Sequence, residues 1–86
     1  MRKRSIIPRN KDSRIQWRFT AWFRDQIGDE IGAATLAAEA LGLSRPTLSR
    51  YLNNWRSLSL DTMAAMAEYV GADLPTALSE AAEMFD

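Results

Sequence analysis

The sequence predicts an all-α fold of five helices with a basic arm in front of them. Apolar residues recur at intervals of three and four in five segments, which is the period of an amphipathic helix. Residues that favour helix starts and helix ends separate these segments, and no segment alternates apolar and polar residues as a strand does. We therefore expect one small domain in three parts: an arm over residues 1–12, a helical domain over 13–72, and an acidic C-terminal helix within 73–86.

The first two helices are each expected to end at a glycine. Asp12 or Ser13 can cap the first helix, and Gly28 can end it. After a loop, a second and shorter helix over about 34–41 ends at Gly42. The expected buried stripe of the first helix consists of Ile15, Phe19, Trp22, Phe23 and Ile27.

The other three helices each follow a residue that suits an N-cap, and these caps are Ser44, Ser59 and Asp73. Pro46 fits the first turn of the third helix, where no intrahelical donor is needed. Asn53 and Asn54 are expected to end the third helix, and Gly71 the fourth. The expected buried positions are Leu48, Tyr51 and Leu52 in the third helix, Leu60, Met63, Met66, Ala67 and Val70 in the fourth, and Leu74, Leu78, Ala81 or Ala82 and Phe85 in the fifth.

The composition argues against several classes of protein. The 86 residues contain no cysteine and no histidine, so a disulfide framework, a zinc finger or a histidine-activated serine nucleophile cannot form. The sequence has no phosphate-binding glycine loop, no apolar run of membrane-spanning length, and no apolar stretch behind its basic start. We expect a cytoplasmic protein that is not an enzyme and that uses no metal or other cofactor.

Charge is strongly segregated along the chain although its net value is zero. Residues 1–28 hold eight Lys and Arg against two acidic residues, whereas residues 61–86 hold six acidic residues and no Lys or Arg. Such segregation lets one end of a molecule face a polyanion while the other end avoids it.

The segment over about 34–53 has the pattern of a helix-turn-helix. Two helices that cross steeply through a tight turn need a small residue at their contact and a residue that tolerates positive φ in the turn; Ala38 and Gly42 meet these needs. The expected apolar anchors are Leu36, Ala37 and Leu41 in the first helix, Leu43 in the turn, and Leu48 and Leu52 in the second helix.

With these residues the sequence resembles the Cro/repressor (XRE-like) family of phage and bacterial helix-turn-helix DNA-binding proteins. The stretch over 59–74 is similar to the helix and turn that follow the motif in that family. The resemblance implies a compact lambda-repressor-like fold, with the helix over 45–53 in the major groove of double-stranded DNA. Two positions depart from the family pattern: Ala34 stands where a phosphate-binding Gln is common, and Pro46 stands where Gln is common in the recognition helix.

A recognition helix presents small polar and basic side chains to base edges. We expect base contacts from Arg45, Pro46, Ser49 and Arg50. We expect contacts to the DNA backbone from Thr35, Ser44, Thr47, Asn53, Asn54 and Arg56. The arm is expected to follow the duplex with Arg2, Lys3, Arg4, Arg9 and Lys11. Trp55 is expected to be a packing residue.

The function expected from these features is transcriptional control by a Cro-type phage or prophage repressor. A homodimer on a palindromic operator is expected, because one recognition helix reads only a few base pairs. The candidate dimer residues are Leu74, Leu78 and Phe85, which could instead close the core of the monomer. No small-molecule effector is evident. Two alternatives remain open: an antitoxin or protein-binding adaptor with secondary DNA contact, and an architectural DNA binder of the excisionase or packaging type.

Overall fold

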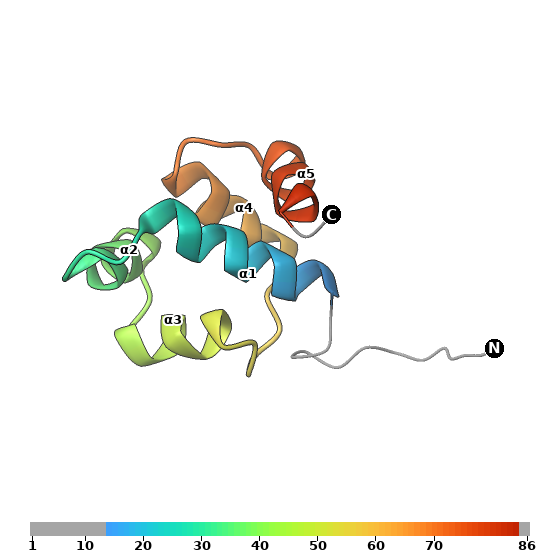
Figure 1. The fold of residues 1–86 in the computed structure, drawn as a ribbon. Coiled ribbons are helices and arrows are strands. Elements are labelled where there is room, and N and C mark those ends of the chain that lie inside the picture. Colours follow the sequence, from blue (N-terminus) through green and yellow to red (C-terminus); the bar gives the residue numbers. More distant parts are fainter. Residues whose placement is uncertain (1–13, 85–86) are drawn as a thin grey trace.

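The five expected helices are all present in a computed structural model, which describes residues 14–84 (Figure 1). The basic arm and Phe85 lie outside the described residues. No helix within residues 14–84 is long and apolar enough to cross a membrane. The helices are α1 (Arg14–Ile27), α2 (Ala33–Leu41), α3 (Arg45–Leu52), α4 (Leu60–Tyr69) and α5 (Leu74–Glu83), and no strand occurs among them.

Helix α1 lies at the centre of the fold and packs against each of the other four helices, most extensively against α5. In Figure 1 it runs across the middle of the molecule, with α3 below it and α4 and α5 above it. Phe19, Trp22 and Phe23 of α1 are fully buried, as expected. The other buried apolar residues are Ala37, Ala38, Leu48, Leu52, Met63, Met66, Ala67, Ala77 and Ala81. The core is therefore formed by α1 and by contributions from every other helix.

Three of the helices begin with the same local hydrogen bond. The side chains of Ser44, Ser59 and Asp73 accept from the backbone N–H groups of Thr47, Thr62 and Thr76 at 3.2, 3.1 and 2.8 Å. Each bond satisfies a backbone donor that has no partner within its helix. The three N-caps expected from the sequence are therefore confirmed.

The Asp73 cap is expected to make the stability of the protein depend on pH in acid. Hydrogen bonds from Thr76 hold the pKa of the Asp73 carboxyl below its ordinary value of 3.8. Because the folded state lowers this pKa, the contribution to stability is present above pH 3.8 and is lost as the pH falls through the lower, folded value. Asp73→Asn keeps a capping oxygen without the titration, so its melting temperature should fall less steeply in acid than that of the wild type.

Thermal melts monitored by circular dichroism at a series of pH values would measure this difference. Asp29→Asn is the matched control, because it removes the same charge from an exposed aspartate in the loop between α1 and α2. Parallel curves of melting temperature against pH for the wild type and Asp73→Asn would contradict the prediction.

Three residues expected in the apolar stripes are instead exposed: Ile15, Leu36 and Leu60 are 66%, 61% and 69% exposed. On α1 the polar side chain of Gln16 takes the buried position next to Ile15. On α2 the buried face is formed by the small residues Ala37 and Ala38, and Leu36 lies outside it. Leu60 is the first residue of α4, about one turn before the first buried position of that helix.

Candidate nucleic-acid interface

Helices α2 and α3 form a tight bihelical unit. Ala37 and Ala38 of α2 are buried, which lets the neighbouring helices approach closely. Gly42 adopts a left-handed conformation with φ of 72°, and the N–H of Leu43 donates to the carbonyl of Ala38 at 2.8 Å. This hydrogen bond and the left-handed conformation of Gly42 end α2 and turn the chain within a few residues. The left-handed turn expected at Gly42 is confirmed, and Ala38 is buried, as a small residue at a helix contact would be.

Helix α3 has one buried face and one outward face. Leu48 and Leu52 are buried and fix the helix to the rest of the core. On the other face Pro46 and Arg50 are exposed and Ser49 is half-buried, and Arg45 is exposed as the first residue of the helix. The side chains of Arg45 and Arg50 make no hydrogen bond to another of residues 14–84, so both guanidinium groups are available to a ligand.

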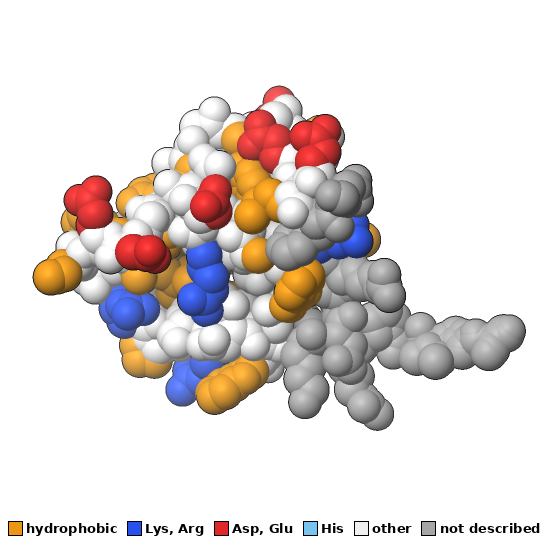
Figure 2. Space-filling view, in the orientation of Figure 1, with side chains coloured by type: hydrophobic (Ala, Val, Ile, Leu, Met, Phe, Trp, Pro, Cys, Tyr) orange, Lys and Arg blue, Asp and Glu red, His pale blue; other side chains and the backbone are white. Residues whose placement is uncertain are grey.

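The charges of the folded molecule are separated in space as well as along the chain. Of the arginine side chains that Figure 2 shows in blue, most lie in the lower part of this view, around α3, and one lies at the right near α5; Asp and Glu side chains lie higher up, over α5 and beside the end of α1. The outward face of α3 therefore lies in the basic part of the surface, where a polyanion is favoured.

A helix-turn-helix family model matches residues 34–76, half of the chain, from α2 into α5. The chain belongs to the Cro/XRE-like helix-turn-helix family. Proteins of this family are DNA-binding transcription regulators, and α2 and α3 form the helix-turn-helix of this chain. The second helix of such a motif, here α3, is called the recognition helix. Comparison of the chain with curated proteins and with solved structures found no match.

The polar residues near the ends of the recognition helix already bond to one another. At its start the Ser44 hydroxyl donates to Thr47 Oγ1 at 2.8 Å. At its end Asn53 Nδ2 donates to the Ser49 carbonyl at 2.9 Å and to Ser49 Oγ at 3.2 Å. These exposed or half-buried side chains are thus oriented before any ligand binds, which lowers the entropy cost of binding.

Arg24 of α1 is a residue of this surface that the sequence did not reveal. Its Nη2 donates to Asn53 Oδ1 at 3.1 Å, so a cation from α1 lies at the C-terminal end of the recognition helix. A cation is favourable at that end, where the helix dipole is negative. Thr35 lies exposed on α2, whose start has no side-chain cap.

Asn54 was expected to contact the DNA backbone, but in the structure its side chain is buried and leaves little surface for such a contact. Its side chain is only 7% exposed, and its Oδ1 lies 3.3 Å from the hydroxyl of Thr20 on α1. Its φ of 62° is in the left-handed region, which Asn tolerates better than most residues. The N–H of Asn54 donates to the Tyr51 carbonyl at 2.9 Å. Asn54 therefore ends the recognition helix and connects it to α1.

The next residue was assigned wrongly, because Trp55 is 72% exposed and is not a packing residue. Its N–H donates to the Arg50 carbonyl at 2.8 Å, which completes the left-handed ending of α3. Arg56 follows with its guanidinium carbon 5.4 Å from the centre of the Tyr51 ring, a cation–π arrangement that leaves Arg56 exposed.

Gln16 of α1 holds the loop after the recognition helix. Its Nε2 donates to the Arg56 carbonyl at 2.7 Å, and its Oε1 accepts from the N–H of Leu58 at 2.9 Å. The side chain is only 6% exposed. One buried amide therefore satisfies two backbone groups of a loop that lies 40 or more residues away in the sequence.

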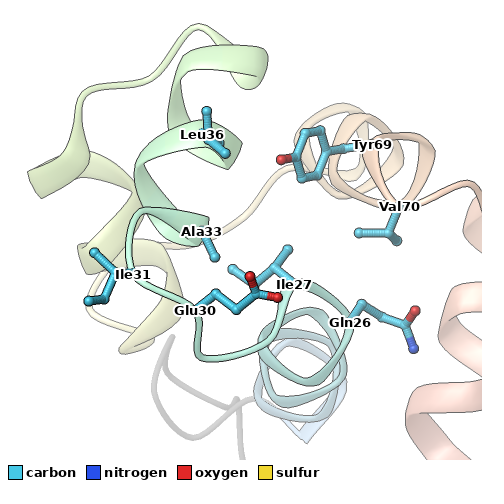
Figure 3. A pocket seen from close by; sticks show the side chains of 8 residues that line it. All are labelled: Gln26, Ile27, Glu30, Ile31, Ala33, Leu36, Tyr69 and Val70. Carbon is cyan, nitrogen blue, oxygen red and sulfur yellow. The ribbon is translucent and has the colours of Figure 1, made fainter.

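An open hollow of about 510 Å³ lies apart from the recognition helix (Figure 3). It is bounded by the end of α1, the start of α2 and the end of α4. Its lining consists of Gln26, Ile27, Glu30, Ile31, Ala33, Leu36, Tyr69 and Val70. The exposed Leu36 belongs to this hollow and not to the core.

Proposed function

We propose that the protein is a compact Cro-type repressor of phage or prophage origin, which occupies an operator with α3 in the major groove. The observation that carries the proposal is the outward face of α3. Arg50 projects from the face opposite Leu48 and Leu52, and Arg45 is exposed at the start of the same helix. Arginine bound to guanine O6 and N7 is the commonest specific contact in the major groove.

The proposed contacts follow from exposure. Base contacts come from Arg45, Pro46, Ser49 and Arg50, and Pro46 can offer only an apolar contact, for example to a thymine methyl group. Backbone contacts come from Thr35, Ser44, Thr47, Asn53 and Arg56, all of which are exposed or half-buried. The arm residues Arg2, Lys3, Arg4, Arg9 and Lys11 add charge along the duplex in this proposal.

A homodimer remains part of the proposal, with a modified contact surface. Leu74 and Leu78 are partly buried against the core, so they are only partly available to a second copy. Beside Leu78, a hollow of about 360 Å³ is lined by Ile15, Arg18, Ala81 and Ala82. The exposed Ile15 and this hollow offer an apolar surface through which α1 and α5 of two copies could pair.

One observation favours a protein-binding role as the second candidate. The hollow of Figure 3 exposes Ile31, Leu36 and Tyr69, and Asp29 and Glu30 lie in the loop at its edge. An apolar surface with acidic neighbours suits a partner that presents apolar and basic side chains.

The deciding experiment is the selection of bound duplexes from a random library by the full chain at near-physiological salt. A two-fold symmetric consensus with half-sites about one helical turn apart would support the dimeric repressor. An asymmetric consensus would retain DNA recognition and overturn the symmetric dimer. Failure to enrich any duplex would contradict the repressor and favour the protein-binding role.

A further inference from the structure

Trp55 is an unusually exposed aromatic residue in an otherwise well-anchored loop. The three tryptophans differ widely: Trp22 is 2% exposed, Trp17 is 46% exposed and Trp55 is 72% exposed. An indole is among the most costly side chains to leave in water, and tryptophan is enriched where proteins bind partners. Exposure on this scale shows that the Trp55 side chain contributes little to the core.

The backbone that carries Trp55 is held on both sides. Before it, buried Asn54 lies against Thr20 of α1, and the N–H of Trp55 itself bonds to the Arg50 carbonyl. After it, Gln16 bonds to the carbonyl of Arg56. The loop therefore presents the indole at a defined place, and binding a ligand there costs little additional ordering.

That place adjoins the outward face of the recognition helix. The bond to Arg50 connects the backbone of Trp55 directly to the last turn of α3, and the exposed Arg56 is the next residue. Figure 1 shows the loop after α3 on the same lower side of the molecule as α3 itself. In Figure 2 hydrophobic and basic side chains lie next to each other along this lower edge.

We propose that Trp55 is a DNA-backbone contact that packs its indole on a deoxyribose beside the groove that α3 enters. This inference rests on the proposed function. The indole offers an apolar face that matches the sugar, and its Nε1–H is a donor suited to a phosphate oxygen. The exposed Arg56, the next residue in the chain, attracts a neighbouring phosphate. A sugar contact carries no base sequence, so Trp55 raises affinity for all duplexes alike.

Trp55→Ala tests the inference by its effect on two duplexes, the selected operator and an unrelated sequence of equal length. Both dissociation constants should rise by about tenfold, the scale expected when an interface loses a large buried aromatic surface. The slope of log affinity against log salt should not change, because no charge is removed. Trp55→Phe should lose less affinity for both duplexes than Trp55→Ala, since it keeps an apolar ring.

Leu36→Ala is the matched control, because Leu36 is 61% exposed but lies on α2 at the hollow away from α3. It should leave both dissociation constants unchanged. Melting curves of each variant confirm folding. Unchanged affinity of Trp55→Ala for both duplexes, or a loss confined to the operator, would overturn the sugar contact.

Fluorescence gives a second readout that needs no change at Trp55. In a Trp17→Phe background the remaining tryptophans are buried Trp22 and exposed Trp55, so quenching by acrylamide reports mainly on Trp55. Quenching should fall when either duplex is bound, and undiminished quenching in the bound state would overturn the inference. If the wild type binds no duplex, the proposed function and this inference fail together; if it binds and Trp55→Ala binds equally well, this inference alone fails.

Discussion

Arg50→Ala is expected to weaken binding to the selected operator by about tenfold to a hundredfold, while binding to an unrelated duplex changes much less. A bidentate arginine–guanine pair discriminates against the wrong base by about 1–3 kcal/mol, and about 1.4 kcal/mol corresponds to a factor of ten. Arg50 is exposed on the outward face of α3. Because Leu48 and Leu52 hold the opposite face in the core, the substitution should not disturb the fold.

Two further variants separate base reading from simple loss of charge. Arg56→Ala removes the same charge from an exposed residue that is proposed to contact the DNA backbone. Because a backbone contact carries no base sequence, it should weaken binding to the two duplexes alike. Arg50→Lys keeps the charge but loses the planar fork, so it should still lose operator affinity. Equal losses on both duplexes for Arg50→Ala, measured by fluorescence anisotropy titrations, would contradict base readout by this residue.

The helix ends could be predicted from the sequence because they are encoded locally. Ser44, Ser59 and Asp73 each bond to the backbone three residues ahead, so the cap and its partner lie within one short segment. Gly42 is equally local, because only the backbone of its own helix and the next residue define its left-handed turn. A cap or turn that depends only on a few neighbouring residues can be recognised in a single sequence.

The buried face of α1 could be predicted only in part. Periodicity identified Phe19, Trp22 and Phe23 correctly but placed Ile15 inside, because it counts apolar residues alone. In the structure the polar Gln16 and Thr20 are buried. Gln16 bonds to the loop after α3, and the Thr20 hydroxyl donates to the Trp17 carbonyl of its own helix at 3.0 Å and also lies 3.3 Å from Oδ1 of Asn54 in that loop. A buried polar residue is stable only with such partners. No local pattern shows which distant segment will supply them.

The candidate DNA surface shows the same division between local and distant information. Helical spacing puts Arg50 opposite Leu48 and Leu52, so its exposure could be predicted; Arg45, three residues before Leu48, is exposed at the first position of the helix. For Asn54 and Trp55, in the loop after α3, the structure shows the opposite of what was expected, because Asn54 is buried and Trp55 is exposed. Judged by hydrophobicity alone, Trp55 would be buried and Asn54 would be exposed. Their orientation depends on the left-handed φ of Asn54 and on its contact with Thr20, 34 residues away.

The loop after α3 is as much a part of the DNA-binding architecture as the turn before it. The turn at Gly42 fixes where the recognition helix begins, and Asn54 and Gln16 fix the segment that follows it. Both of these polar side chains connect α3 or its loop to α1, the helix at the centre of the core. Core stability and the geometry of the surface that presents Arg50, Trp55 and Arg56 are therefore coupled.

Gln16→Ala should reveal this coupling as a loss of both stability and DNA affinity. It leaves the Arg56 carbonyl and the Leu58 N–H without their partner, and an unsatisfied buried polar group costs about 1–3 kcal/mol. For a domain of this size each kcal/mol lowers the melting temperature by about 4–8 °C. Below the melting temperature the variant remains folded, but its loop is less well anchored, so affinity should fall on operator and unrelated duplex alike.

Gln26→Ala is the matched control, since it truncates an exposed glutamine of the same helix and should change the free energy of unfolding by less than about 0.5 kcal/mol. Gln16→Met keeps the side-chain volume but not the hydrogen bonds, so it separates packing from polar satisfaction. Urea unfolding and DNA titration on the same samples provide the two measurements. If Gln16→Met were as stable as the wild type, the two hydrogen bonds would not hold the loop, and packing alone would have to explain its position. If both Gln16 variants lost stability but kept full DNA affinity, the loop would contribute to folding and not to the surface that binds DNA.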